Sequence, residues 1–179
     1  MLKLLHYPLV LGLITFLAAL GLAGVEELTR EPIAEALRQD FLKGLNTVLP
    51  VFDNEPDMDV VEVDGATVYV GRLSGEITGY AVNASSMKGY GGEIRVIVGV
   101  DARGNITGVE VLTHRETPGL GDKITTENFL NLFKGRSINE TYRVKADGGD
   151  IDQFSGATIS PRAVTEAVNK AVEILGGAL

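Results

Sequence analysis

The chain has 179 residues, 22 glycines, two histidines, no cysteine and a formal net charge of −8 at pH 7. This length allows one domain with a hydrophobic core and a short appendage. Without cysteine the chain has no disulfide, thiolate-held zinc or iron–sulfur cluster of its own, so redox chemistry here requires an organic cofactor. The acidic balance argues against a basic face for nucleic acid, and we expect no nucleic-acid partner.

The first predicted element is an apolar helix of membrane-spanning length. Residues 7–25 carry no charge, and about 20 apolar residues suffice to cross the hydrocarbon core. Lys3 precedes this segment and Glu26 and Glu27 follow it, which by the positive-inside rule places the N-terminus in the cytoplasm. A cleaved signal peptide is the alternative, but its apolar region spans only about 7–15 residues. We predict a retained single-pass anchor over 1–28, with the rest of the chain on the periplasmic or extracellular side of the inner membrane.

A second helical pattern occupies residues 29–52. Thr29 is a candidate N-cap, and Pro32 fits the first turn of a helix that starts there. Apolar residues then recur at steps of three and four as far as Val48, and Pro50 ends the pattern. The segment is either a stalk that continues the anchor or a packing helix of the following domain, and both interpretations fit the pattern.

Residues 53–179 are predicted to form one domain that begins with an antiparallel sheet. Asp64-Gly65 is typical of a two-residue hairpin turn, and consecutive hairpins favour antiparallel pairing. Strands are expected at 60–63, 67–70, 76–82, 93–100 and 106–112, with a possible further strand at 142–145. Thr125 or Thr126 is expected to cap a short helix. The predicted fold class is α+β, with one N-terminal transmembrane helix, a mainly antiparallel sheet and flanking helices.

Two glycine-bearing loops interrupt this pattern. In Met87–Gly92 three glycines surround Tyr90, which predicts a flexible loop able to bring backbone against a planar ring, although a plain turn has the same composition. In His114–Gly121, Pro118 forces an extended residue before it, and the glycines permit a sharp turn with its N–H groups aimed outward. Taken alone, each segment is merely a turn.

The stretch from Asp152 to Arg162 leads into the last predicted helix. Ser160 followed by Pro161 is typical of an N-cap and first helical position. The helix is expected to begin just after Thr158, and Gly176-Gly177 is expected to close it. Its apolar stripe comprises Val164, Ala167, Val168, Ala171, Val172 and Leu175. Free N–H groups and the helix dipole at such a start favour an anion such as a phosphate.

Three motifs together resemble those of FMN-binding domains. Asp152-x-x-Ser155-Gly156-Ala157-Thr158 resembles the flavinylation motif, in which the last threonine carries FMN through a phosphoester bond. Glu116–Gly121 and the Gly89–Gly92 loop resemble the second signature and the glycine loop of the same family. With its anchor, the chain is similar to the G-subunit family of Rnf ion-translocating oxidoreductases, which is related to the C subunit of the sodium-translocating NADH:quinone oxidoreductase.

This resemblance implies an electron-transfer role with no catalytic residue and no metal in the chain. FMN would be esterified to Thr158, with Ser155, Gly156 and Ala157 shaping its turn. The ring would be framed by Glu116, Thr117, Gly119, Leu120, Gly89 and Tyr90. The implied partners are the other membrane subunits of a complex that links ferredoxin and NAD to sodium or proton movement, and a separate flavin transferase that makes the bond. Turnover would then belong to the complex, as an ion-translocating oxidoreductase, and not to this chain alone.

The residues themselves leave other functions open. One alternative is a flavinylated extracytoplasmic electron carrier with no ion pump. Another is a non-redox, membrane-anchored assembly or ligand-binding protein in which the Ser-Gly-Ala-Thr turn only caps a helix. A hydrolase nucleophile at Ser155 or Thr158 has no nearby base in sequence. His114 either assists proton coupling or lies partly exposed at a strand end.

Overall fold

The computed structural model describes the chain from residue 2 onward, and its side chains from Tyr7 onward. The chain divides into two compact units, one ending at Asp40 and one running from Phe41 to Leu179. The helices and strands are α1 (Leu2–Val48), β1 (Val60–Val63), β2 (Ala66–Leu73), β3 (Glu76–Gly89), β4 (Gly92–Asp101), β5 (Ile106–Thr113), η1 (Gly121–Thr125), α2 (Glu127–Leu130), η2 (Lys145–Asp147) and α3 (Ile159–Gly176).

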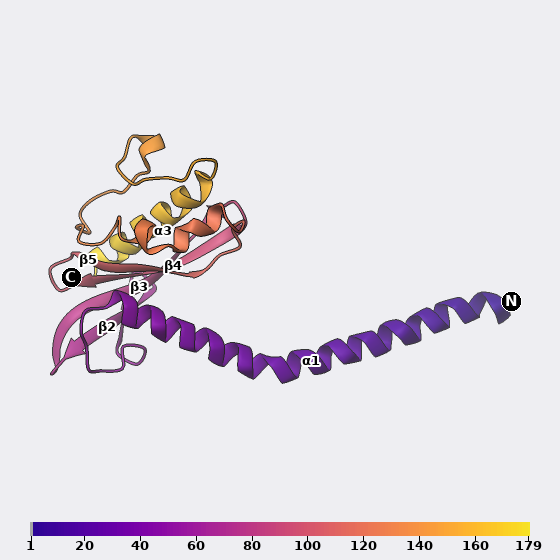
Figure 1. Ribbon diagram of the computed structural model, residues 1–179. Helices are drawn as coiled ribbons and strands as arrows, with labels where there is room; N and C mark the ends of the chain where they lie inside the picture. The colour runs from indigo at the N-terminus through magenta and orange to yellow at the C-terminus, as the bar shows by residue number, and fades with distance from the viewer. Residues whose placement is uncertain (1) are drawn as a thin grey trace. The chain divides into compact units, whose positions relative to one another are not determined.

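The helix α1 is continuous, so the predicted helix start at Thr29 is wrong (Figure 1). The Thr29 hydroxyl donates back to the carbonyl of Val25 at 2.8 Å, which leaves the side chain inside the helix instead of at its cap. Pro8 and Pro32 both lie within the helix. Two helical patterns separated by a cap signal are therefore one helix.

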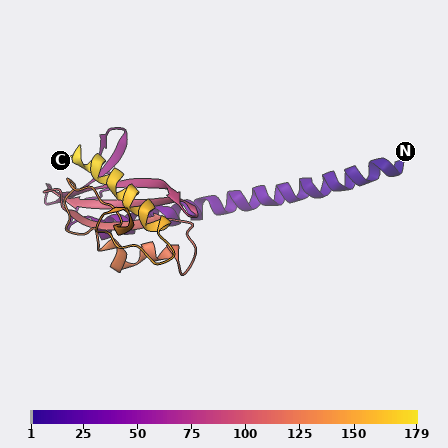
Figure 2. The ribbon, with the colours of Figure 1, turned by 90° about the horizontal axis from the view of Figure 1, so that it is seen from above.

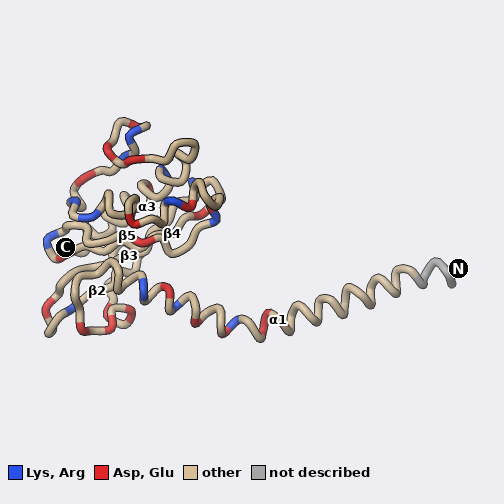
Figure 3. Tube along the Cα trace, viewed as in Figure 1, with Lys and Arg blue, Asp and Glu red and all other residues tan. Residues whose placement is uncertain are grey.

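The N-terminal part of α1 is long and apolar enough to cross a membrane. The candidate span from Tyr7 has a mean hydropathy of 2.2 in its most apolar window. Its large apolar side chains are exposed to the surroundings: Leu9, Val10, Leu11, Leu13, Ile14, Phe16, Leu17, Leu20, Leu22 and Val25. Figure 3 shows no charged residue in the described part of α1 before Glu26, and charged residues follow from there toward residue 48. A helix that is apolar all round suits lipid.

The five strands form one sheet in the order β1-β2-β3-β4-β5, and every neighbouring pair is antiparallel, as predicted (Figure 1). Asp64 and Gly65 form the first hairpin turn with φ of 50° and 79°, a conformation that explains the glycine. β3 and β4 are longer than predicted, since β3 continues to Gly89 and β4 begins at Gly92. The predicted flexible loop is therefore a tight hairpin turn at Tyr90-Gly91.

Alternating side chains of β3 and β4 build a core on each face of the sheet. Val82, Val96 and Val98 face α3, whose predicted apolar stripe is buried. Ala81 and Ile97, one residue out of phase, face the C-terminal end of α1. Figures 1 and 2 show α3 lying across the strands.

The end of α1 is seated in a notch formed by glycines of the sheet. The Thr107 hydroxyl donates to the Val48 carbonyl at 2.5 Å, which satisfies one of the unpaired carbonyls of the last helical turn. A Cβ placed on Gly99 would lie 2.6 Å from the carbonyl carbon of Val48, and one on Gly108 would lie 3.0 Å from its Cα. Only glycine admits the helix end at this depth.

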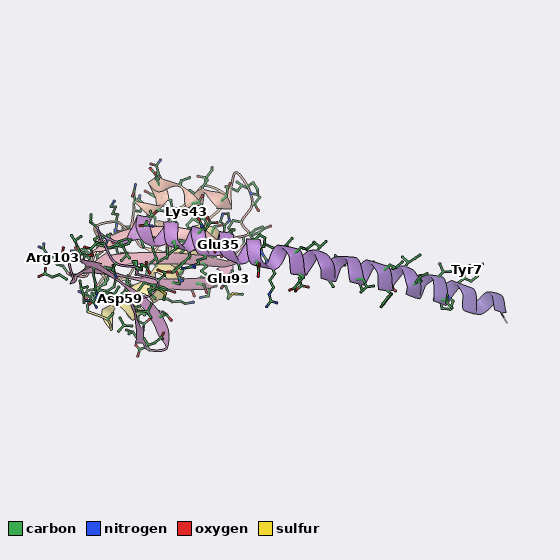
Figure 4. The ribbon with its side chains drawn as sticks, turned by 90° about the horizontal axis from the view of Figure 1, so that it is seen from below. Tyr7, Glu35, Lys43, Asp59, Glu93 and Arg103 are labelled. Carbon is green, nitrogen blue, oxygen red and sulfur yellow. The ribbon has the colours of Figure 1, made fainter. Side chains whose placement is uncertain are left out.

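The segments that flank the sheet have their own contacts, and two of them differ from the predictions. In the connector before β1, Asp59 accepts from Arg72 at 2.7 Å (Asp59 is labelled in Figure 4). Thr126 does occupy the N-cap position of α2, but its hydroxyl donates to the Lys123 carbonyl and not to the helix. Among the described residues, the segment 142–145 pairs through one isolated bridge, from Val144 to Ile151, so the strand predicted there does not form.

Candidate functional site

A pocket of 330 Å³ lies where three segments distant in sequence meet. They are the β3–β4 turn, the loop that follows β5, and the start of α3. The pocket is lined by Tyr90, Glu116, Thr117, Leu120, Gly121, Gly156, Ala157, Thr158, Ile159 and Ser160. The two glycine-bearing loops and the Ser-Gly-Ala-Thr motif, which the sequence links only by resemblance, thus share one cavity of a size typical of ligand sites.

Most of the predicted site residues line this cavity, and three do not. Ser155 is exposed beside the pocket, and Gly119 sits in the exposed turn with φ of 77°. Gly89 lies behind the wall, where an added Cβ would be 2.7 Å from the Glu116 carboxylate. Sequence reasoning did not assign Ile159 or Ser160 to the site, although both directly follow the motif.

Thr158 occupies the N-cap position of α3, and the helix begins at Ile159 as predicted. Its side chain makes no capping hydrogen bond and is half-buried in the pocket wall. Gly156 has φ of 81°, in the left-handed region that favours glycine. The turn is closed by the N–H of Ala157, which donates to the Phe154 carbonyl at 3.1 Å. The motif therefore presents a hydroxyl at a helix N-terminus, where an anion is favoured.

Ser160 has a different role from the predicted one. The N-cap is Thr158, and the buried Ser160 hydroxyl donates to Oε2 of Glu116. A short polar side chain next to proline resembles a cap in sequence, but here its partner is a carboxylate 44 residues earlier in the chain. No local pattern predicts that bond.

The loop after β5 also differs from the prediction. The N–H groups of Leu120 and Gly121 point back to the Thr117 carbonyl, at 3.2 and 3.1 Å, instead of outward. These bonds close the turn on itself. The ring-framing donors that the sequence suggested at these two positions are therefore already used, and the loop contributes side chains and shape to the pocket.

The pocket wall carries a negative charge and no positive one. None of its lining residues is Lys or Arg, whereas Glu116 lines it and is 6% exposed. Arg162, one turn into α3, is held by Asp147 through Nε at 2.7 Å and Nη2 at 2.5 Å. That hydrogen bond holds the pKa of Asp147 below its usual value. The helix N-terminus is thus the electropositive feature beside Thr158.

His114 lies just beyond β5, half-buried and outside the pocket lining. Its Nδ1 accepts a hydrogen bond from the Glu116 N–H at 3.2 Å. The ring therefore supports the start of the loop.

Comparison with known proteins agrees with this geometry. The FMN-binding domain family matches residues 89–173, which contain all three pocket segments. The chain is 42% identical to the G subunit of the ion-translocating oxidoreductase complex of Stutzerimonas stutzeri, over 94% of this chain and 79% of that protein. The same protein of Cereibacter sphaeroides is 41% identical over 93% of this chain and 81% of its own length. The chain belongs to the G-subunit family of ion-translocating oxidoreductase complexes. It is thus one component of an Rnf-type multisubunit oxidoreductase, and it carries an FMN-binding domain.

Two solved structures have a similar fold. Shewanella oneidensis NqrC is 25% identical with a TM-score of 0.50, over 65% of this chain and 67% of that one. The C subunit of the Na(+)-translocating NADH-quinone reductase from Parabacteroides distasonis is 22% identical with the same TM-score, over 71% and 76%. The second likeness concerns the fold alone.

The residues of the pocket fit FMN. The N-terminus of α3 and the Thr158 hydroxyl suit a phosphate group, while Tyr90, Leu120 and Ile159 give the same cavity apolar surface for a planar ring. These three side chains are 72%, 47% and 45% exposed, so contact with a ring would bury apolar area that otherwise faces water.

Proposed function

We propose that the chain carries FMN covalently, through a phosphoester bond to Thr158, and serves as an electron-transfer subunit of its complex. The observation that carries this proposal is the Thr158 hydroxyl, half-buried at the N-terminus of α3 in the cavity shared by all three motifs. Bound FMN supplies reversible electron transfer, which no side chain of this cysteine-free chain provides.

The charge of the pocket supports a covalent bond over simple binding. Free FMN brings a phosphate group with up to two negative charges, yet the lining residues include a buried glutamate and no cation. The partial charge of a helix N-terminus contributes only about 0.3–2 kcal/mol toward holding an anion. Esterification to Thr158 removes one of the phosphate charges and makes retention independent of affinity.

The chain's own residues have distinct roles in this proposal. Thr158 is the attachment residue, and Gly156 gives its turn the required backbone conformation. Ser155 and Ala157 complete the turn beside the phosphate. Tyr90 and Leu120 contact the ring, while Thr117, Gly119 and Gly89 shape the loops behind it.

We further propose that residues 7–25 span the cell membrane once, with the N-terminus in the cytoplasm and the flavin on the opposite side. Lys3 before the span and Glu26 and Glu27 after it support this orientation. A non-covalent cofactor on that side would be lost by dilution, because its occupancy depends on free concentration. We propose 29–52 as a stalk whose last turns pack against the sheet, and 53–179 as the flavin domain. A dedicated flavin transferase attaches the FMN, and neighbouring membrane subunits deliver and remove electrons.

Intact mass of the full chain tests this proposal. The chain is purified from membranes of cells that also contain a flavin transferase, beside Thr158→Ala and Thr158→Ser variants. We expect one FMN phosphoester on the wild type, none on Thr158→Ala, and partial modification of Thr158→Ser, which keeps a hydroxyl. Fluorescence of the band in a denaturing gel reports the same bond. An unmodified wild type, or flavin retained by Thr158→Ala, contradicts the proposal.

A further inference from the structure

Glu116 is a buried carboxylate that joins two walls of the flavin pocket. It is 6% exposed. Its Oε1 accepts from the N–H of Gly91 at 3.0 Å, and its Oε2 accepts from the hydroxyl of Ser160. Gly91 belongs to the β3–β4 turn, next to Tyr90, and Ser160 lies two residues beyond Thr158. One side chain therefore links the ring-side turn to the proposed attachment site.

The surrounding backbone is shaped around this carboxylate. A Cβ on Gly89 would lie 2.7 Å from Oε1 of Glu116. A Cβ on Gly121 would lie 2.7 Å from Oε2 and 2.6 Å from the Ser160 hydroxyl. These distances are well below ordinary contact distances, so any larger residue at either glycine displaces the carboxylate or its partner. Gly121 is thus explained by Glu116 and Ser160. Gly89 is required both by Glu116 and by the backbone carbonyl oxygen of Gly92, which would lie even closer to an added Cβ, and it does not line the pocket.

The position of this charge has an electrical consequence. Burial of a carboxylate is unfavourable unless hydrogen bonds compensate, and Glu116 has two such bonds to neutral donors. No lysine or arginine lines the pocket to balance it. Because Glu116 is buried, water screens its charge only weakly, and a negative charge there raises the free energy of an electron added to a ring bound beside it.

We propose that Glu116 is a positioning residue that locks the Tyr90 turn against the start of α3 and, with its fixed charge, lowers the reduction potential of the flavin. This inference rests on the proposed attachment of FMN at Thr158. In this proposal Glu116 sets the reduction potential of the flavin from within the pocket wall. Ser160 acts as the hydrogen-bond donor to Glu116 and not as a helix cap.

The test is a spectroelectrochemical titration of the full flavinylated chain in detergent. Glu116→Gln removes the charge but keeps the size and an oxygen acceptor, and its midpoint potential is expected to be more positive than that of the wild type. Ser160→Ala keeps the charge but frees the carboxylate to move, so a smaller positive shift is expected. Glu127→Gln, the same chemical change on α2 outside the pocket lining, is the control and is expected to leave the potential unchanged.

Each result has a defined meaning. A Glu116→Gln potential equal to or below that of the wild type overturns the proposal. If that variant does not accumulate, Ser160→Ala decides the question, and an unchanged potential in it likewise overturns the proposal. The glutamate variants leave Thr158 in place, and intact mass confirms that they carry FMN. A wild type without FMN refutes the proposed function, whereas a flavinylated wild type with an unresponsive Glu116→Gln refutes only this inference.

Discussion

Replacement of Gly99 by alanine tests whether the end of α1 is fixed in its notch on the sheet. Gly99 lies on β4 directly beneath Val48, the last residue of α1. The added Cβ would lie 2.6 Å from the carbonyl carbon of Val48 and 2.9 Å from its Cβ, with the carbonyl oxygen closer still. Ordinary carbon contacts are about 3.5–4.0 Å, so the helix end has to move by roughly an ångström.

Two terms set the size of the effect. Overpacking of a tight contact costs about 1–3 kcal/mol. Movement of the Val48 carbonyl also breaks its bond from Thr107, and an unsatisfied buried carbonyl costs about 1–3 kcal/mol more. The expected loss is therefore roughly 2–6 kcal/mol, a large share of the 5–15 kcal/mol that typically stabilises a domain.

The measurement is thermal unfolding of the full chain in detergent, followed by circular dichroism. A loss of this size lowers the midpoint by roughly 5–20 °C in a chain of this length. Gly176→Ala is the matched control, because an added Cβ there meets nothing within 4 Å and lies at the end of a helix. It is expected to be neutral or slightly stabilising. If Gly99→Ala melts within about 2 °C of the wild type, α1 is not held at this depth and the reasoning fails.

Three further predictions concern the motif, the core and the membrane orientation. Gly156→Ala places a Cβ on backbone with φ of 81°, which costs about 1–2 kcal/mol, so we expect reduced flavinylation by intact mass, and complete modification would contradict this role. Burial, reinforced by Glu140, raises the pKa of Tyr142 to about 12. This pKa is above the unfolded value near 10, so the folded state favours the protonated hydroxyl. The contribution of that hydroxyl to folding stability is fully present below about pH 10 and is lost as pH rises toward 12. Urea titrations at a series of pH values measure the free energy of unfolding, which is therefore expected to fall less steeply with pH across that window in Tyr142→Phe than in the wild type. An equally steep fall in the variant would show that other groups cause it. Arg103 lies in the exposed turn between β4 and β5 (Figure 4), and the chain has no cysteine of its own. Arg103→Cys is expected to react with a membrane-impermeant maleimide in cells whose outer membrane is permeabilised. If it were labelled only after the inner membrane is broken, the domain would lie on the cytoplasmic side, opposite to the proposed orientation.

The elements that the sequence predicted well are those specified by local or periodic patterns. The apolar stripe of α3 ends at Leu175 and is buried as expected, and the Asp64-Gly65 turn takes the backbone that its residues favour. The antiparallel order follows from hairpins, since each strand pairs with its neighbour in sequence. In each case, the information lies within a few residues of the element that it determines.

Two of the failed predictions share a physical cause: a side-chain hydroxyl forms a hydrogen bond other than the helix cap expected of it. Thr29 and Ser160 are both good caps by composition. Thr29 instead bonds to a carbonyl four residues earlier within a continuous helix, and Ser160 bonds to Glu116 across the pocket. A hydroxyl donates to whichever acceptor the folded chain places beside it, local for Thr29 and distant for Ser160, so residue type alone does not determine where a helix starts. The length of β3 was missed because its final residues, near Gly89, lack the alternation of apolar and polar side chains.

The flavin site combines a local part and a non-local part, which have separate consequences. The residues that present Thr158 lie within one turn of chain, so attachment depends mainly on that turn and on the helix after it. The environment of the ring depends on Glu116, which reaches Gly91 across 25 residues and Ser160 across 44. Changes at Gly156 or Thr158 should therefore alter how much flavin the chain carries, while changes at Glu116 should alter the potential of the flavin already attached. If variants at both places shifted attachment and potential in constant proportion, the two parts would not be separable, and the pocket would have to be treated as a single cooperative unit.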